Sequence, residues 1–449
     1  MPSAILHRDL RTTPPLVERG EGAYLFDTTG KRYLDASGGA AVSCLGHSHP
    51  RVIAAIEAQL RRMPFSHTSF FTNQPAEDLA ALLIDRAPAG FGAGRVAFLG
   101  SGSEAMEAAL KLARQHFWEK GEPKRARFIA RRMSYHGNTL GALAIGGHAG
   151  RRAPYAPMLM DVAHVSPCFA YRFQAPGESD DAYATRLADE LAVEIERQGP
   201  ETVAAFIAEP VVGATIGCVP PVPGYFRRIR EVCDRYGVLL IADEVMCGMG
   251  RTGSLFAIAQ EDVCPDIITI AKGLGAGYQP IGALLASETV IAPLAAGSGT
   301  LQHGHTYMSH AIACAGSLAV MRALEEEQLL GAVQQRGRDL EAALRARFGD
   351  HPHVGDIRGR GLFWAMELVA DRATKAPFPK SLGLAAQIKR VALANGLICY
   401  PSGGTADGEN GDHVLLAPPF ILSAPQIDEI VDKLDVSLKQ ALGARPLAA

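Results

Sequence analysis

No uncharged apolar stretch in this sequence approaches the ~18 residues that a membrane-spanning helix requires. The amino-terminal residues also lack a charged region followed by an apolar one, so we expect no secretory signal. The eight cysteines include no Cys-x-x-Cys pair, and several lie within apolar stretches. This distribution indicates buried thiols in a reducing compartment rather than a disulfide framework. We therefore expect a cytoplasmic protein.

A strong excess of either charge is also missing, since 44 basic residues stand against 47 acidic ones and the net charge is −3. This balance argues against nucleic acid or an anionic membrane surface as the main partner and favours a small-molecule ligand. No internal repeat or low-complexity tract is visible. At 449 residues the chain is too long for one compact core and suits one large domain with a smaller one.

Strand and helix patterns alternate along residues 61–325, which predicts an α/β fold with a mostly parallel sheet covered by helices. We assign this segment to a large domain. Residues 326–449 suggest helices against a short antiparallel sheet and are assigned to a smaller α+β domain. Residues 1–60 are expected to pack with that smaller domain, because chain ends often lie together.

Five apolar runs are typical of buried strands, and chemically useful residues follow them. Ligands collect at the carboxyl ends of parallel strands, so these residues are expected to line one crevice. The runs are residues 96–99 before a Gly-Ser-Gly-Ser-Glu turn, 203–208 before Glu209, 238–242 before Asp243, 267–271 before Lys272, and 281–286, which completes the set.

The turn after the first run has two interpretations. Ser101 and Glu104 have the spacing of a helix capping box. Gly102 and Ser103 would also offer N–H groups and a hydroxyl at the positive end of a helix, where a phosphate binds readily. We keep Ser101, Gly102 and Ser103 as candidate phosphate ligands.

Two strand-end residues are candidates for catalysis. Asp243 could be an ordinary helix cap or ion-pair partner, but a carboxylate there also suits holding a proton on a heteroaromatic nitrogen, and Glu244 stands beside it. A lone lysine such as Lys272 usually reaches solvent. The glycines that follow Lys272 are not a dinucleotide fingerprint, because no helix opens there.

Other residues carry weaker signals. Tyr135 and His136 offer an aromatic face on a loop, although a core tyrosine is an equally good interpretation. Residues 305–307 could simply cap the following helix. Structural roles are favoured for two further pairs: the histidines His47 and His49, which lack a third metal ligand, and the arginines Arg358 and Arg360, which suit ion pairs.

A phosphate seat, an acid 29 residues before a lysine, a stackable aromatic and a strand-end glutamate together meet the needs of pyridoxal 5′-phosphate (PLP). The lysine would form a Schiff base with the aldehyde of PLP. The aspartate would keep the pyridine nitrogen protonated so that the ring accepts electrons. No metal is expected.

The sequence resembles the class III PLP-dependent aminotransferases of fold type I over nearly its whole length. The most specific stretches are residues 208–213, 220–225, 240–253 and 265–275. The resemblance implies that Lys272 is the Schiff-base lysine, that Asp243 pairs with the pyridinium, and that Val245 packs on the ring face opposite Tyr135. It also implies that Thr306 reaches the phosphate of the other subunit in a homodimer, which could assemble further into a tetramer.

Departures from the family pattern narrow the substrate. The ornithine-type branch has glutamine where Met246 stands and a carboxylate-binding arginine where Leu415 stands. The chain looks more like the ω-amino acid and amine:pyruvate branch. A mobile carboxylate-binding arginine is expected there too, but Gly408 occupies about its position, which leaves the cation open.

We therefore expect a ping-pong aminotransferase that moves an amino group from an amine or ω-amino acid to a keto acid, with pyruvate as the expected acceptor. Within the same fold, dialkylglycine-type decarboxylation or an aminomutase reaction is the alternative, because the electron sink is shared. A catalytically silent binding protein and a nicotinamide-dependent enzyme are the hypotheses from other classes.

Overall fold

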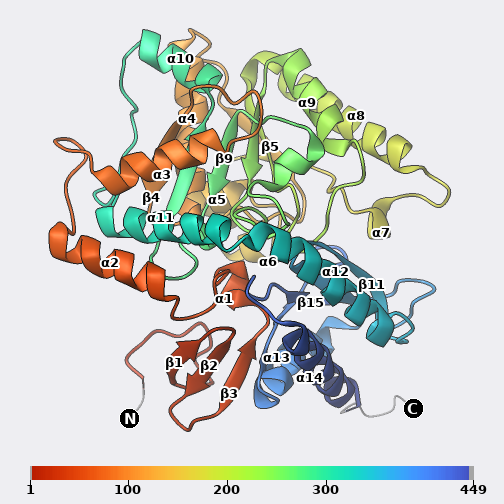
Figure 1. Ribbon diagram of the computed structural model, residues 1–449. Helices are drawn as coiled ribbons and strands as arrows, with labels where there is room; N and C mark the ends of the chain where they lie inside the picture. The colour runs from red at the N-terminus through yellow and green to blue at the C-terminus, as the bar shows by residue number, and fades with distance from the viewer. Residues whose placement is uncertain (1–2, 444–449) are drawn as a thin grey trace.

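The computed structural model describes residues 3–443, and its centre is a seven-stranded sheet (Figure 1). The strand order is β4-β10-β9-β8-β7-β5-β6, and every neighbouring pair is parallel except those that involve β10. The expected α/β fold with a mostly parallel sheet is confirmed. The strands are β4 (Arg95–Leu99), β5 (Arg127–Arg131), β6 (Ala163–Val165), β7 (Val203–Ala208), β8 (Leu239–Asp243), β9 (Ile267–Ile270) and β10 (Gly282–Ala286).

Every residue of the central strands β7, β8, β9 and β10 is buried. Their valine, isoleucine, leucine and alanine side chains face helices on both sides, as a parallel sheet requires. The helices of this part of the chain are α2 (Pro50–Arg62), α3 (Gln74–Asp85), α4 (Gly102–Glu119), α5 (Leu140–Ile145), α6 (Ala149–Arg152), α7 (Ala170–Phe173), α8 (Asp180–Gln198), α9 (Tyr225–Tyr236), α10 (Glu288–Ala296) and α11 (Ala311–Glu326).

Strand β10 corrects one expectation from the sequence. It runs antiparallel to both of its neighbours, with Gly282 opposite Leu99 and Ala283 opposite Ile270. The run at residues 281–286 therefore begins, rather than ends, at the edge where β4 and β9 terminate. The residues before β10, not those after it, lie near the functional edge of the sheet.

Two smaller sheets flank the large one. One has the order β11-β12-β15-β14 and is antiparallel throughout; the other, β1-β2-β3-β13, joins segments from the two halves of the chain. Their strands are β1 (Val17–Glu21), β2 (Tyr24–Asp27), β3 (Arg32–Asp35), β11 (Val354–Arg360), β12 (Phe363–Leu368), β13 (Leu397–Ile398), β14 (Tyr400–Gly403) and β15 (Asp412–Leu416).

The amino-terminal strands lie beside the carboxyl-terminal helices at the bottom of Figure 1. β13 pairs in parallel with β3, and the Lys31 ammonium donates to the Ala394 carbonyl at 2.8 Å. The helices here are α1 (Gly38–Ala41), α12 (Leu329–Phe348), α13 (Leu384–Ala394) and α14 (Ala424–Gly443). The three-segment domain division stays a prediction. Within residues 3–443, no helix has the length and apolar character needed to cross a membrane.

Candidate active site

A cavity of about 530 Å³ opens at the carboxyl ends of the parallel strands. This is the edge at which open α/β sheets bind their ligands. Loops after β4, β5, β7, β8 and β9 contribute to its wall, together with the segment before β10. The lining residues are Val42, Gly100, Ser101, Gly102, Ser103, Tyr135, His136, Gly137, Glu209, Gly213, Ala214, Asp243, Val245, Met246, Ala271, Lys272, Gly277, Gln279, Pro280 and Ile281.

Lys272 follows β9 directly and faces this cavity. Its backbone has φ +43°, a left-handed conformation that costs a non-glycine residue free energy and is characteristic of functional sites. Burial lowers the pKa of the Lys272 amine, and this effect exceeds the opposing attraction of Asp243. A larger fraction of neutral, nucleophilic amine results.

Asp243 ends β8, and its carboxylate is 3% exposed. One oxygen, Oδ2, lies 2.7 Å from His136 Nδ1, and the other, Oδ1, accepts from the Val245 backbone N–H at 3.0 Å. The Thr269 hydroxyl donates to the same Oδ1 at 3.5 Å. These contacts fix the carboxylate in one orientation while it still borders the cavity.

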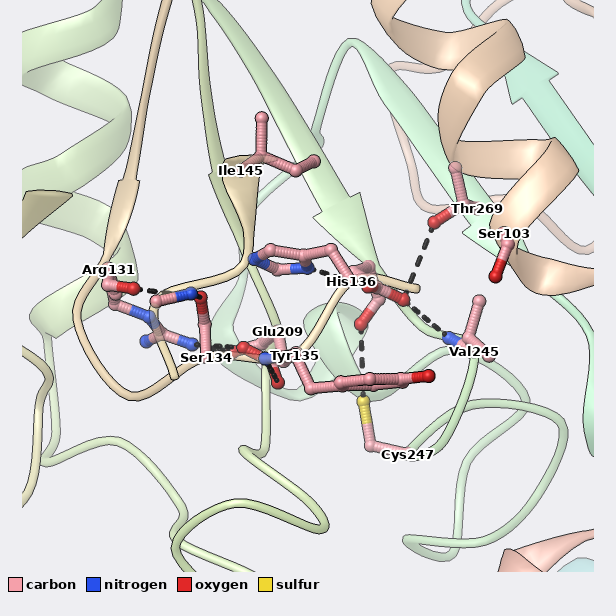
Figure 2. A network of polar contacts seen from close by, with 12 residues as sticks. Ser103, Arg131, Ser134, Tyr135, His136, Ile145, Glu209, Val245, Cys247 and Thr269 are labelled. Atoms are coloured by element: carbon pink, nitrogen blue, oxygen red, sulfur yellow. Dashed lines mark hydrogen bonds and ion pairs between the residues drawn. The ribbon is translucent and has the colours of Figure 1, made fainter. Parts of the chain in front are cut away.

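Figure 2 shows that Tyr135, His136 and Glu209 lie close together in one polar network. Glu209 Oε1 accepts from the Tyr135 backbone N–H at 3.2 Å and so holds the loop that carries the tyrosine. Burial raises the pKa of Glu209, although Arg131 lies 3.6 Å from its Oε2. His136 Nε2 is buried without a hydrogen-bond partner among the described residues.

The amino end of α4 forms the opposite wall. The Ser101 hydroxyl accepts from the Glu104 N–H at 3.2 Å, and Glu104 in turn accepts from the Gly100 N–H at 2.7 Å, so the predicted cap is present. The N–H groups of Gly102 and Ser103 have no partner within residues 3–443. Because they lie at the positive end of an 18-residue helix and border the cavity, they suit an anion.

Close backbone approaches set the dimensions of this wall. A Cβ atom at Gly102 would lie 2.9 Å from Val245 Cγ1. A Cβ atom at Gly282, the first residue of β10, would lie 2.3 Å from the Ser101 carbonyl oxygen. The start of β10 is therefore pressed against the turn that precedes α4, and glycine is required for this contact.

Glu244 does not belong to the cavity, although the sequence associates it with Asp243. Its side chain is fully buried and accepts from the N–H groups of Ala257 at 2.8 Å and Ile258 at 2.7 Å. Burial raises its pKa to about 7. Glu244 anchors the chain that follows β8 and has a structural position.

The structure thus brings together nearly all of the predicted site residues: Ser101, Gly102, Ser103, Tyr135, His136, Glu209, Asp243, Val245 and Lys272. Thr306 is the exception, because it lies in an exposed turn outside the cavity wall of this chain. Its role stays a prediction.

Sequence reasoning missed several contributors. Arg131 is 1% exposed and donates to the Glu209 carbonyl. The signal in the sequence that could have identified it is a charged residue at the end of β5. Gln279 and Pro280 line the cavity because β10 is antiparallel, which the sequence does not reveal. Val42, from the amino-terminal segment, carries no recognisable signal.

The residues with weaker signals form structural contacts. His47 lies 3.3 Å from Asp35, and His49 lies 3.1 Å from Glu327. Arg358 forms an ion pair with Glu367 at 2.7 Å within the small antiparallel sheet. Arg360, in contrast, lies 2.8 Å from Glu261, a residue of the segment between β8 and β9.

The positions that distinguish the substrate branches are apolar or lack a side chain. Met246 lines the cavity, and Leu415 is fully buried in an apolar cluster against which Met246 and Tyr400 pack. Gly408 adopts φ +93° in the loop between β14 and β15. None of these positions supplies a cation.

Comparison with known proteins agrees with this geometry. The family model for aminotransferase class-III matches residues 5–438. The chain belongs to the class III aminotransferases. It is 46% identical to an uncharacterised aminotransferase of Schizosaccharomyces pombe, over 96% of this chain and 94% of that protein. It is 36% identical to gamma aminobutyrate transaminase 3, chloroplastic, of Solanum lycopersicum, over 95% and 81% of the two chains.

Solved structures give the same result. An ω-transaminase from Pseudomonas jessenii in complex with PMP superposes with a TM-score of 0.91 and 36% identity, covering 98% of this chain and 96% of that one. A transaminase with L-Ala superposes with a TM-score of 0.89 and 36% identity, covering 96% and 99%. The protein is a PLP-dependent aminotransferase, and membership in this family favours that hypothesis over the nicotinamide-dependent and silent binding alternatives.

The cavity fits this cofactor. The unpartnered N–H groups of Gly102 and Ser103 suit a phosphate, and the space bounded by Tyr135 and Val245 suits a flat ring. The oriented, buried Asp243 carboxylate and the Lys272 amine, whose pKa is lowered, complete the donor set.

Proposed function

We propose that this aminotransferase moves an amino group from an amine or ω-amino acid donor to a keto acid, with pyruvate as the acceptor, in two half-reactions. The observation that carries this proposal is the Lys272 amine, whose pKa is lowered, in a cavity beside the oriented Asp243 carboxylate and an apolar wall at Met246. The wall suits a donor whose carbon skeleton carries no charge near the reacting carbon.

Each polar residue has a separate task in this proposal. Gly102 and Ser103 would hold the phosphate of PLP, and Asp243 would keep a proton on the pyridine nitrogen. When bound, PLP supplies an electron sink for the charge that proton removal leaves on the substrate. The Lys272 amine, once free, would remove the proton from the substrate carbon that bears nitrogen and would return it to the cofactor. His136 orients Asp243 throughout.

The names of related proteins support the substrate classes. One relative is named a gamma aminobutyrate transaminase, and gamma aminobutyrate is an ω-amino acid; another is named an ω-transaminase; a third structure holds L-Ala, which is the aminated form of pyruvate. The leucine at position 415 and methionine at 246 argue against the ornithine-type pattern.

We also propose that the enzyme works as a homodimer with Thr306 serving the neighbouring subunit's phosphate. Tyr307, Phe70 and Phe71 are 65%, 79% and 69% exposed. Two chain segments carry them, and these segments touch, since Phe65 packs edge-on against Tyr307 with ring centroids 5.6 Å apart. Such an apolar surface beside Thr306 suits a second copy of the chain.

A spectrophotometric half-reaction screen tests the proposed function. The purified enzyme with PLP is mixed with a panel of amines and ω-amino acids, and loss of its visible absorbance is followed. Pyruvate is then added, and recovery of the absorbance with formation of alanine is expected. Release of carbon dioxide in the first half-reaction would instead indicate decarboxylation. Return of the same carbon skeleton with a moved amino group would indicate an aminomutase.

A further inference from the structure

The cavity wall contains one cationic side chain among the described residues, that of Lys272. A keto acid brings a carboxylate that must lose part of its hydration when it enters, and this loss is costly unless a cation or several donors replace the water. Lys272 is committed to the reaction itself. A second cation at the rim of the cavity would replace the water that the carboxylate loses.

Arg151, in α6, occupies that rim. Its guanidinium carbon lies 4.9 Å from the centroid of the Tyr135 ring, and Tyr135 lines the cavity. The residue is exposed, and its guanidinium has neither an ion pair nor a hydrogen bond with any residue in the range 3–443. Contact with a ring face uses none of its five N–H donors, so all remain available to a carboxylate.

The charge of Arg151 is felt inside the cavity. It opposes the effect of burial on the Tyr135 hydroxyl, whose pKa is raised, and it contributes to the lowered pKa of Lys272. An anion bound beside the two residues would therefore experience the same positive field.

The loop that carries Gly408 lies against α6. A Cβ atom at Gly408 would lie 3.9 Å from the Ala149 Cβ, and one at Gly150 would lie 4.0 Å from the Gly408 carbonyl oxygen. The loop thus packs against α6 at a point where it presents no side chain. Arg151 follows in the same helix turn. Among the cations that contact the cavity wall, it is the nearest in sequence to the point where the loop meets α6.

Two other arginines are weaker candidates. Arg152 points to a separate cavity that Asp161 also lines, and its Nε atom is buried without a partner among the described residues. The charge of Arg8 reaches the Tyr135 hydroxyl, but Arg8 makes no ring contact with Tyr135 within residues 3–443. Arg8 serves as a matched control for a purely long-range effect.

We propose that Arg151 binds the carboxylate of the keto acid acceptor from the rim beside Tyr135 and so determines the preference of the enzyme for keto acids over uncharged carbonyl compounds. This inference rests on the proposed transamination. The planar guanidinium can engage both carboxylate oxygens at once. A donor amine without a carboxylate does not use this contact.

The test replaces Arg151 by methionine, which keeps a flexible chain over Tyr135 but removes the charge. The aminated enzyme is mixed with pyruvate or with propanal, an uncharged three-carbon acceptor, and the second-order rate constants are compared. Arg151→Met should lower the constant for pyruvate roughly 10- to 100-fold, the range expected for a lost hydrogen bond to a charged group, and that for propanal by less than about threefold. Arg151→Lys should recover part of the loss.

A binding measurement accompanies the kinetics. Propionate, an unreactive carboxylate, should bind the wild-type enzyme with PLP and bind Arg151→Met about 10-fold or more weakly by calorimetry. Arg8→Ala should leave both the rate ratio and propionate binding within about twofold of wild type.

Three results would overturn the inference: an unchanged pyruvate constant in Arg151→Met, an equal loss for pyruvate and propanal, or the selective loss appearing in Arg8→Ala. An equal loss would indicate that Arg151 positions Tyr135. A wild-type enzyme that aminates neither acceptor would instead contradict the proposed function itself.

Discussion

The His136 imidazole and the Asp243 carboxylate lie 2.7 Å apart, and each residue is 3% exposed. One residue follows β5 and the other ends β8, so the contact joins two loops at the same edge of the sheet. It leaves the remaining Asp243 oxygen to the Val245 N–H and the cavity. The contact with His136 therefore fixes the orientation of the negatively charged Asp243 carboxylate in the site.

Replacement of Asp243 by asparagine should slow proton removal by orders of magnitude. The amide keeps the shape but loses the negative charge that stabilises a protonated pyridine nitrogen, so the electron sink weakens. Stopped-flow half-reaction rates measure this effect. His136→Gln keeps the Asp243 charge and should slow proton removal far less. Equal losses of rate in the two variants, or an unchanged rate in Asp243→Asn, would contradict the role of the charge.

Lys272→Ala should abolish turnover while the fold and non-covalent PLP binding persist. Both the covalent link and the proton-transferring amine are lost. Circular dichroism and PLP retention after gel filtration serve as controls for folding. Addition of a small amine such as methylamine should restore a trace of activity, whereas near wild-type turnover without it would remove Lys272 from the mechanism.

Thr306→Ala should weaken PLP retention about 10- to 100-fold, because a hydrogen bond to a charged group contributes ~1.5–3 kcal/mol. Equilibrium dialysis of PLP measures the change. Thr300→Ala, which removes the hydroxyl of another exposed threonine outside the cavity wall of this chain, is the matched control.

Mixed dimers test whether Thr306 serves the other subunit. If Thr306→Ala and Lys272→Ala subunits combine, a shared arrangement gives one site with both lesions and one with neither. The mixture should then exceed the activity of either parent. Heterodimers that show only the average of the parents would place both residues in the same subunit's site.

Glu244→Gln should make stability less dependent on pH. The buried carboxyl has its pKa raised from 4.5 to about 7, so the native protein binds an extra proton between these values. Stability of the wild type therefore falls as pH rises through this window and changes no further above it. Relative to wild type, the variant should gain up to about 3 kcal/mol in free energy of unfolding as the pH rises from 4.5 to 8, at ~1.4 kcal/mol per pKa unit. Thermal midpoints across this range measure the difference, and parallel curves would contradict the assignment.

Gly282→Ala should impair PLP retention more than it impairs folding. The added Cβ would lie 2.3 Å from the Ser101 carbonyl oxygen, which forces the turn before α4 to move. Gly331→Ala is the matched control, because a Cβ at that exposed helical position meets nothing within 4 Å. The control should be neutral or slightly stabilising, since alanine favours helix more than glycine does by up to about 1 kcal/mol. Equal PLP affinity in the two variants would argue against the contact.

The strand-end residues could be predicted from sequence for a clear physical reason. Buried parallel strands are continuous apolar runs, so the first polar residue after a run marks the carboxyl edge of the sheet, as it does for Asp243 and Glu209. Lys272 follows the same rule after β9. These three positions required no knowledge of tertiary contacts beyond strand direction.

Strand direction itself was the limit of that reasoning. A run such as residues 281–286 is equally apolar whether it is parallel or antiparallel, so the placement of Gln279 and Pro280 on the cavity wall needed the pairing of β10. The surroundings of Glu244 likewise could not be read from the sequence. Adjacent residues on an extended chain point to opposite sides, so its partner became the segment at Ala257 rather than the cavity.

The pairing of β3 with β13 has a consequence for the synthesis of the chain. Lys31 and Ala394, which meet beside these strands, are 363 positions apart. A chain emerging from the ribosome therefore leaves the edge of β3 unpaired until well after β10, the last strand of the large sheet, has been translated, and closing so long a separation costs conformational entropy. Until then the amino-terminal hairpin exposes an unpaired strand edge that favours aggregation. Binding of a chaperone, or slow translation, would protect this edge.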